Sequence, residues 1–258
     1  MSLAHDAAIV KRTDVTHDAF LGGRLSISQP VRGFRAGLDS VLLGAAVGPS
    51  AGELLDLGAG VGTAGLVALS IHQVLSACLV ESDPAMAELA AANIAANRLE
   101  ARARVVPVDV AAPGRLRRAA GLPADHFTAI VANPPFYSGG SAAAPARAAA
   151  RSMPADSLDL WVKAAATHAA PGGEIVFIHL ADRLGPLLRS VEARFGALTI
   201  LPLTPREGAP AHRILVRGIK GSRAPLTLLA SRALHEAEGR AFRPEFEAIF
   251  RGRDRLHW

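Results

Sequence analysis

Short apolar segments of strand length alternate with longer alanine-rich segments between residues 53 and 196. This alternation is typical of repeated β–α–β units, which build a parallel sheet covered by helices on both faces. Two more apolar segments, 197–203 and 212–218, are too close together for a helical crossover, so they should pair antiparallel at the sheet edge. We therefore predict an α/β, Rossmann-like fold with seven strands, near 53–57, 76–81, 103–108, 127–132, 174–180, 197–203 and 212–218, and helices near 63–72, 84–97, 113–120, 157–170 and 182–195.

Local signals add boundaries and flanking segments. Asp83 before Pro84 predicts a helix N-cap, and Pro171-Gly172-Gly173 should end the helix over 157–170. A hairpin is expected over 20–31 and a helix near 38–47. We divide the chain into an N-terminal extension that covers the ligand site, a wound core, and a basic C-terminal helix with an irregular tail. These divisions span 1–48, 49–220 and 221–258, and a low-complexity loop occupies 138–150.

Composition indicates a soluble globular protein, because half of the 258 residues are apolar and a fifth are charged. The most apolar stretch, 64–80, is interrupted by polar side chains, so no window supplies the roughly 20 apolar residues of a membrane span. The first residues lack the pattern of a secretory signal, and we expect a cytoplasmic protein with no membrane partner. The single cysteine, Cys78, excludes an internal disulfide and a cysteine-based metal cluster, and we predict no metal site.

Basic residues are unevenly distributed. Residues 205–258 hold eleven basic and six acidic side chains, a difference that equals the net charge of +5 of the whole chain. Arginines also cluster in mid-chain, at Arg98, Arg102, Arg104, Arg115, Arg117 and Arg118. Guanidinium groups suit phosphates because each offers a planar fork of donors, although solvated helix faces would explain the same clusters.

A glycine-rich segment follows the first core strand, with Asp56 before it and Gly58, Gly60 and Gly62 within it. Alternate glycines let the backbone approach a ligand closely, and the following helix start supplies free N–H groups. The spacing of Gly60, Gly62 and Gly65 also fits a dinucleotide fingerprint. For either cofactor class, Glu81 stands where a carboxylate would bind ribose hydroxyls. A carboxylate at Asp56 favours S-adenosylmethionine, whose amino group it can engage, whereas it would repel a pyrophosphate.

Asp109, which follows the third strand, is a candidate contact for an adenine amino group, although acidic residues are common at strand ends. The strongest signal is Asn133-Pro134-Pro135-Phe136, directly after the fourth strand. Ligands of doubly wound sheets bind beyond the carboxyl ends of the strands, so this tetrapeptide should face the same crevice as the glycine segment.

The residue types of the tetrapeptide fit methylation of an amine whose lone pair is delocalised into a π system. The Asn133 side-chain oxygen and the Pro134 carbonyl can each accept a hydrogen bond from the NH2 group, which directs its lone pair at a sulfonium methyl. Pro135 removes a competing donor and keeps the preceding residue extended. Phe136 could stack on the target ring, and Tyr137 could serve either packing or substrate contact.

With these motifs the chain resembles class I S-adenosylmethionine-dependent methyltransferases that carry an N-P-P-[FY] motif. It is most similar to bacterial enzymes that methylate N6 of the adenine beside the anticodon of valine tRNA. The resemblance runs through RGFRAGLDSVLLG, DLGAGVGTAGL, VESDPAMAELAAANIAAN, VANPPFY and AHRILVRG. It implies a cofactor set of Asp39, Asp56, Gly58, Ala59, Gly60, Gly62, Glu81, Asp109, Val110 and Asn133.

The resemblance also implies that Asp39, with Arg35, meets the methionine end of the cofactor, although a helix cap and a solvated arginine are equally good explanations. Catalysis would rest on Asn133, Pro134, Pro135 and Phe136, with Phe136, Tyr137, Arg147 and Arg151 binding an RNA substrate. The C-terminal arginines would hold phosphates, and Arg213 would either join them or cap the last strands. The oligomeric state and the modified RNA position stay open.

Three alternatives are also compatible with the sequence. A protein glutamine is the first, because methylation of release factors uses the same tetrapeptide, although the basic surface argues mildly against it. A nicotinamide-dependent oxidoreductase is the second, although no histidine is expected in the crevice, and His72, His168 and His179 are expected beside the core or at the surface. RNA binding without catalysis is the third, and the intact tetrapeptide argues against it.

Overall fold

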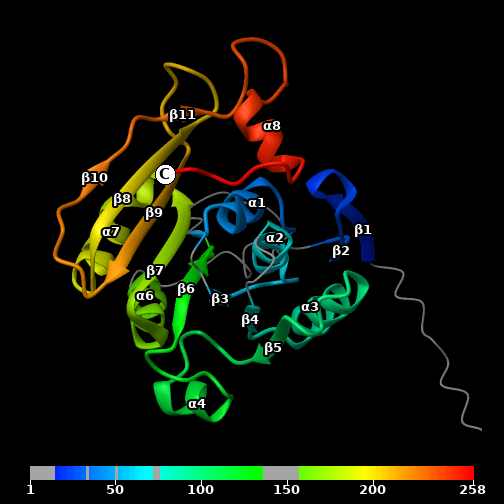
Figure 1. Ribbon diagram of the computed structural model, residues 1–258, viewed down its shortest axis with the longest axis vertical. Helices are drawn as coiled ribbons and strands as arrows, with labels where there is room; N and C mark the ends of the chain where they lie inside the picture. Colours follow the sequence, from blue (N-terminus) through cyan, green and yellow to red (C-terminus); the bar gives the residue numbers. More distant parts are fainter. Residues whose placement is uncertain (1–14, 33–34, 50–51, 72–75, 136–156) are drawn as a thin grey trace, which may run out of the picture.

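The computed structural model describes residues 15–32, 35–49, 52–71, 76–135 and 157–258 (Figure 1). Its main sheet has the strand order β10-β8-β9-β7-β6-β3-β4-β5, with β11 also paired to β8. The five strands from β7 to β5 are parallel, and β9 runs antiparallel to both β7 and β8. The strands are β3 (Glu53–Leu57), β4 (Ser76–Glu81), β5 (Ala103–Pro107), β6 (Phe127–Ala132), β7 (Ala169–Leu180), β8 (Phe195–Thr204), β9 (Arg213–Lys220), β10 (Thr227–Leu228) and β11 (Arg232–Ala233).

All seven predicted strands are present, and the predicted antiparallel pair is confirmed as β8 and β9. Successive side chains of a strand point to opposite faces of the sheet, so each face has its own hydrophobic core. Leu54 packs with helices on one face, and its neighbour Leu55 packs with helices on the other. The first face carries α1 (Leu38–Ala45), α2 (Thr63–Ile71), α3 (Pro84–Ala96) and α8 (Pro244–Phe250), and the second carries α4 (Gly114–Ala119), α6 (Ser157–His168) and α7 (Leu184–Glu192).

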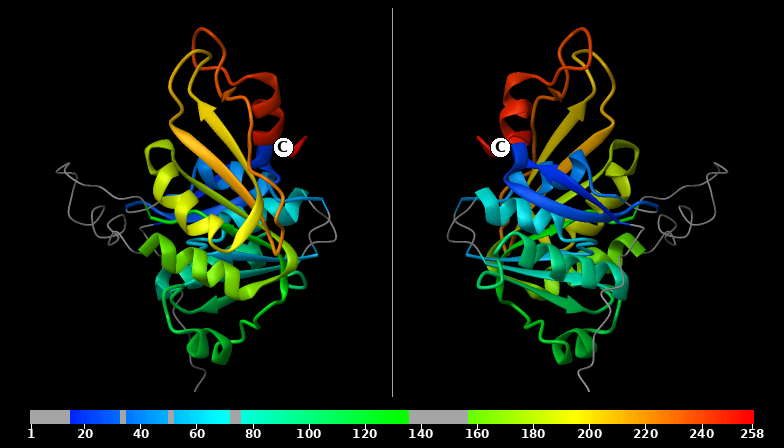
Figure 2. Two further views of the ribbon diagram at one scale, coloured as in Figure 1. Left: turned by 90° about the vertical axis from the view of Figure 1, so that its left-hand side faces the viewer. Right: turned by 90° about the vertical axis from the view of Figure 1, so that its right-hand side faces the viewer.

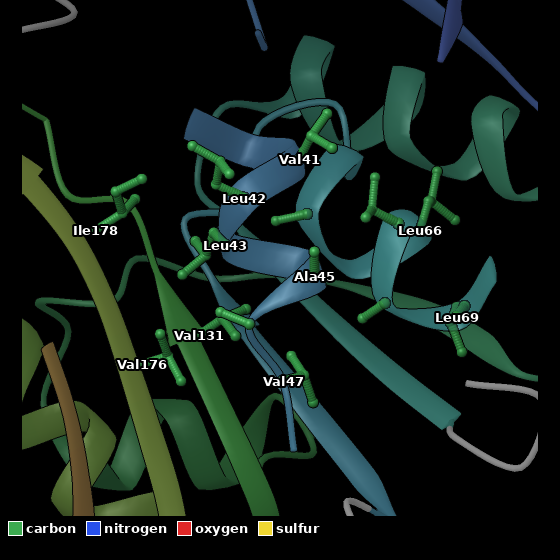
Figure 3. Close-up of a cluster of buried hydrophobic side chains, with 14 of the residues drawn as sticks. Val41, Leu42, Leu43, Ala45, Val47, Leu66, Leu69, Val131, Val176 and Ile178 are labelled. Carbon is green, nitrogen blue, oxygen red and sulfur yellow. The ribbon is translucent and has the colours of Figure 1, made fainter. Parts of the chain in front are cut away.

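Figure 3 shows the core of the first face, where α1 lies between α2 and the sheet. Leu42 and Leu43 of α1 are almost completely buried, together with Val131 of β6 and Val176 of β7. Gly44 permits the close approach of the two helices, because a Cβ at this position would lie 2.4 Å from the carbonyl oxygen of Ala64. The helix that precedes the first core strand is therefore built into the core.

The N-terminal hairpin consists of β1 (Val15–Phe20) and β2 (Leu25–Pro30), which form a separate two-stranded sheet. Side chains of α3 attach it to the core. The Asn97 side chain accepts from the Ser26 N–H and donates to the Ser26 carbonyl. One helical turn earlier, the Asn93 side chain makes the same two hydrogen bonds with Ser28. The predicted hairpin is thus confirmed, starting five residues earlier than expected. Figure 2 shows it beside the C-terminal helix.

The C-terminal segment differs from the prediction. It is not one basic helix, because it first adds β10 and β11 to the edge of β8 in parallel register. The helix that follows, α8, has Glu245 and Glu247 in its first turn and no basic residue. The prediction for Pro171-Gly172-Gly173 also needs correction, because α6 ends at His168 and these residues belong to the start of β7.

Candidate functional site

A cavity of about 660 Å³ opens beyond the carboxyl ends of β3, β4, β5 and β6, beside the start of α1. This is the edge of a doubly wound sheet where ligands bind. Strand ends, the glycine segment and the first turn of α1 form its wall. The lining residues are Arg35, Gly37, Leu38, Asp39, Ser40, Gly58, Gly60, Val61, Glu81, Ser82, Asp83, Met86, Asp109, Val110, Asn133, Pro134, Pro135, Trp161 and Arg213.

The glycine segment is held in a left-handed conformation that few other residues tolerate. Gly58, Gly60 and Gly62 have φ angles of 66°, 57° and 88°. A Cβ on Gly58 would lie 2.2 Å from the Trp161 ring, so the indole replaces side-chain volume at this point of the wall. Gly58 and Gly60 line the cavity, whereas Ala59 and Gly62 belong to the turn behind them. Ala59 donates to the Val80 carbonyl at 2.8 Å.

Glu81 links the glycine segment to the next turn of the wall. One carboxylate oxygen accepts from the backbone N–H of Gly60 at 2.8 Å, and the other accepts from Asp83 at 2.8 Å. Asp83 in turn caps α3 by accepting from Ala85, as the sequence predicted. Asp109 and Val110 lie at the cavity wall after β5. Glu81 and Asp109 therefore bring two carboxylates to the cavity at the ends of the neighbouring strands β4 and β5.

Asp56 lies behind this wall rather than in it. Its carboxylate is almost fully buried and accepts from the backbone N–H of Gly65 at 2.9 Å. Burial raises the pKa of Asp56 to about 7, and the nearby Glu81 carboxylate adds to that increase, while the Gly65 N–H opposes it. Asp56 is not among the residues that line the cavity. Its position fits a role in holding the glycine segment, in place of the direct ligand contact that the sequence suggested.

Asn133 and the two prolines after it reach the cavity from the end of β6. The Asn133 side-chain oxygen is buried and has no hydrogen-bond partner among the described residues. Buried acceptors are normally paired, and leaving one unpaired costs about 1–3 kcal/mol. An unpaired acceptor in a cavity wall is ready to receive a donor from a ligand.

The first turn of α1 closes another side of the cavity. Asp39 forms an ion pair with Arg213 of β9, with 2.9 Å between carboxylate oxygen and Nε. Gly37, not Asp39, is the N-cap residue of α1. Arg35 is not simply solvated, because its guanidinium binds Asp18 at 2.6 Å and also contacts Thr16 and the Pro30 carbonyl.

Several functional residues of the sequence prediction lie outside the described residues, namely Phe136, Tyr137, Arg147 and Arg151, as does His72, for which no function was predicted. The sequence analysis missed Trp161 and Met86, both of which line the cavity. Both stand on helices rich in alanine, where a single large side chain is indistinguishable from ordinary core packing. Only the closure of α6 over the sheet brings Trp161 against Gly58.

Neither described histidine of the core faces the cavity. His168 is fully buried, and its ring nitrogens contact Arg117 and the Pro123 carbonyl. Burial lowers the pKa of His179 to about 4, and its ring accepts from the Leu180 N–H. Both histidines are therefore core residues and lie outside the cavity, where no histidine was expected.

Many of the clustered arginines serve the fold rather than a phosphate. Arg117 is buried and donates to the Val110 and Ala112 carbonyls. Arg206 donates to three carbonyls of the loop 236–239. Arg217 and Lys220 pair with Glu174 and Asp125. Of the C-terminal arginines, Arg206 and Arg217 therefore make contacts within the chain, and phosphate binding by the others stays a prediction.

The described residues offer neither a metal-binding cluster nor a membrane-spanning helix. They contain no group of three or more histidine, cysteine, aspartate or glutamate side chains that could hold a metal ion. In the same part of the chain, no helix combines the length and apolarity needed to cross a membrane.

Comparison with known proteins agrees with this geometry. The sequence model described as "methyltransferase small domain" matches residues 39–201. Two curated proteins from two strains of Porphyromonas gingivalis, both named tRNA1(Val) (adenine(37)-N6)-methyltransferase, are 33% and 32% identical over 201 residues. Each alignment covers 72% of this chain and 76% of the relative.

Solved structures agree as well. An Agrobacterium tumefaciens protein described as a predicted O-methyltransferase matches with a TM-score of 0.73 at 30% identity, over 84% of this chain and 98% of that one. TYW2 of Pyrococcus horikoshii, solved in complex with MeSAdo, matches with a TM-score of 0.52 at 13% identity, over 81% of this chain and 72% of that one. The second likeness concerns the fold alone.

Proposed function

This chain belongs to the methyltransferase small domain family and is an S-adenosylmethionine-dependent methyltransferase, and we propose that it methylates N6 of an adenine in structured RNA. The acceptor that we favour is an adenine of a tRNA anticodon loop. The observation that carries the proposal is the buried side-chain oxygen of Asn133 in the wall of the cavity, which has no hydrogen-bond partner among the described residues. It requires a donor, and an exocyclic amine supplies one.

The cavity also fits the cofactor. Glu81 and Asp109 end neighbouring strands, where carboxylates can accept from ribose hydroxyls and an adenine amino group. Gly60 lines the cavity without a side chain, whereas the space beside Gly58 is filled by the Trp161 ring. At the α1 side, where Asp39 and Arg35 line the cavity, we propose that Asp39 meets an ammonium group and Arg35 a carboxylate. Asp56 would act indirectly, by holding the glycine segment through Gly65.

When bound, the cofactor supplies an electrophilic sulfonium methyl. The work of the chain is then to position the acceptor amine and to stabilise the charge that develops on it. Asn133 accepts one N–H of the amine through its side-chain oxygen, and the Pro134 carbonyl accepts the other. The two acceptors direct the nitrogen lone pair at the methyl group. As the new C–N bond forms, the bond from the methyl carbon to sulfur would break, and its electron pair would stay on the sulfur of the neutral thioether that leaves. The amine nitrogen is then positively charged and releases a proton, so no base is needed before transfer.

RNA as the acceptor is supported by charge and by kinship. The two Porphyromonas gingivalis relatives are named as tRNA adenine methyltransferases. In this chain, residues 111–122 contain three arginines and no acidic residue, next to the cavity wall at Val110. Arg115 and Arg118 of this segment are exposed. An unpaired loop adenine costs little to unstack, which favours loops as targets.

The test is methyl transfer from labelled S-adenosylmethionine into total bacterial tRNA, followed by nucleoside analysis of the product. We expect N6-methyladenosine with the natural chain and a loss of at least 100-fold with Asn133→Ala. Binding of S-adenosylhomocysteine should change less than threefold in that variant. Methyl incorporation into a release-factor glutamine, with none into RNA, would overturn the proposal in favour of a protein acceptor.

A further inference from the structure

The segment after β11 lies outside the matched family region and packs on α1. Phe246 and Ile249 of α8 and the later Leu256 are buried in the same cluster as Leu42 and Leu43 of α1. Figure 1 shows α8 and the chain after it beside α1 and the N-terminal hairpin. Arg24 of the hairpin turn also donates to the Gly252 carbonyl. The C-terminal segment therefore touches both elements that precede the core.

The contact with α1 is polar as well as apolar. The last carbonyls of a helix have no partner within the helix and must find donors elsewhere. In α1 these donors come from the end of the chain. The Leu256 backbone N–H donates to the Ala45 carbonyl at 2.9 Å, and the Trp258 Nε1 donates to the Ala46 carbonyl at 2.9 Å.

A buried ion pair secures the same place. Glu174 of β7 is 6% exposed and accepts from the Gly48 N–H, just after α1, at 2.6 Å. Its other oxygen lies 2.9 Å from Arg217 of β9. The Arg217 guanidinium lies over the Trp258 ring, 5.8 Å from its centre. Trp258 thus joins the end of α1 to the sheet through Arg217 and Glu174.

The opposite end of α1 forms part of the cofactor cavity. Leu38, Asp39 and Ser40 of its first turn line the cavity. A helix this short moves as a rigid body, so the position of its last turn sets the position of its first. Loss of the hydrogen bonds to the Ala45 and Ala46 carbonyls would let α1 shift, and this shift would move Asp39 away from the cavity and from Arg213.

We propose that Trp258 and the backbone of Leu256 are positioning residues for cofactor binding, which cap α1 and hold its first turn against the cavity. Trp258 and Leu256 would act at the cofactor end of the proposed site. Binding of S-adenosylhomocysteine needs no acceptor, so a failure of this role and a failure of the RNA assignment are distinguishable.

The test compares Trp258→Ala and Trp258→Phe with the natural chain by calorimetric titration of S-adenosylhomocysteine. Phenylalanine keeps a ring beneath Arg217 but removes the Nε1 donor. We expect the dissociation constant to rise at least fivefold with alanine and about two- to threefold with phenylalanine. In methyl transfer, the KM for S-adenosylmethionine should rise while kcat at saturating cofactor and the KM for RNA stay unchanged.

The control is His257→Ala, because His257 is exposed and pairs only with Asp254 among the described residues. Its dissociation constant should equal that of the natural chain. If Trp258→Ala lowers the melting temperature but leaves the dissociation constant within twofold, Trp258 is merely structural and the proposal is wrong. Should the alanine variant fail to fold, Trp258→Phe decides, and an unchanged dissociation constant in that variant overturns the proposal.

Discussion

The side-chain amide of Asn93 donates to the Val61 carbonyl at 2.9 Å, and so ties α3 to the glycine segment of the cavity. The same side chain accepts from the Ser28 N–H at 2.7 Å and donates to the Ser28 carbonyl at 3.1 Å. Asn93 is fully buried, and its amide therefore joins three elements that are distant in sequence. One residue couples the N-terminal hairpin to the ligand loop.

Asn93→Ala should lower the free energy of unfolding by about 2–4 kcal/mol, because it leaves two buried carbonyls and one N–H without partners. Asn97→Ala is the matched control. It removes a similar pair of bonds to Ser26 at a more exposed place, so the loss should be about 1 kcal/mol. Urea unfolding of both variants measures the difference. Equal losses would show that burial does not set the cost.

Gly58→Ala should destabilise the fold and abolish cofactor binding. The residue has a φ of 66°, and its new Cβ would lie 2.2 Å from the Trp161 ring. Gly239→Ala separates strain from clash, since Gly239 has a φ of 73° and nothing within 4 Å of a new Cβ. We expect about 1 kcal/mol for the Gly239 variant and at least 3 kcal/mol for the Gly58 variant in thermal unfolding. Comparable losses would contradict the role given to Trp161.

Asp56 should make stability depend on pH. Its pKa is about 7 in the folded chain and near 4 in the unfolded chain, so the folded state holds more protons between these values. Stability should therefore fall as pH rises from about 4 to about 7 and then level off. The full effect is at most about 4 kcal/mol, because a tenfold change in proton affinity corresponds to about 1.4 kcal/mol.

The measurement is the free energy of unfolding from pH 4 to pH 8 for the natural chain and for Asp56→Asn. Asparagine keeps an oxygen that can accept from Gly65 but carries no charge. The difference in stability between the two proteins should change over this range in favour of the variant at pH 8. A difference that stays constant with pH would mean that Asp56 does not titrate in the folded chain as described.

Arg115 and Arg118 should contribute to RNA affinity without reading its sequence. The double change Arg115→Glu with Arg118→Glu should weaken RNA binding about tenfold at low salt, and less at high salt. The control is the double change Arg189→Glu with Arg223→Glu, which alters the net charge by the same amount. Arg223 follows the end of β9, which is antiparallel to β7, so it lies at the end of the strands opposite the cavity. Filter binding of tRNA compares the two proteins. An equal loss of tRNA affinity in both double variants would mean that only the net charge of the protein matters, and would contradict the role of Arg115 and Arg118.

The sequence by itself determined the wound core. Apolar periodicity, Asp83 before Pro84 and the glycine segment are local signals, so they predicted seven strands and the crevice that Glu81, Asp109 and Asn133 face. Parallel strands place their carboxyl ends at one edge, and for that reason residues far apart in sequence could be assigned to one site from the element order alone.

Only the tertiary structure decided how the remaining residues are used. Asp56, predicted from the sequence as a ligand, is buried and accepts from the Gly65 N–H, and Arg206, Arg217 and Lys220 make contacts within the chain. Strands β10 and β11 have two residues each, too short for a periodic pattern. Trp258 caps a helix more than 200 residues away. Contacts of this kind depend on packing between distant segments, which no local pattern encodes.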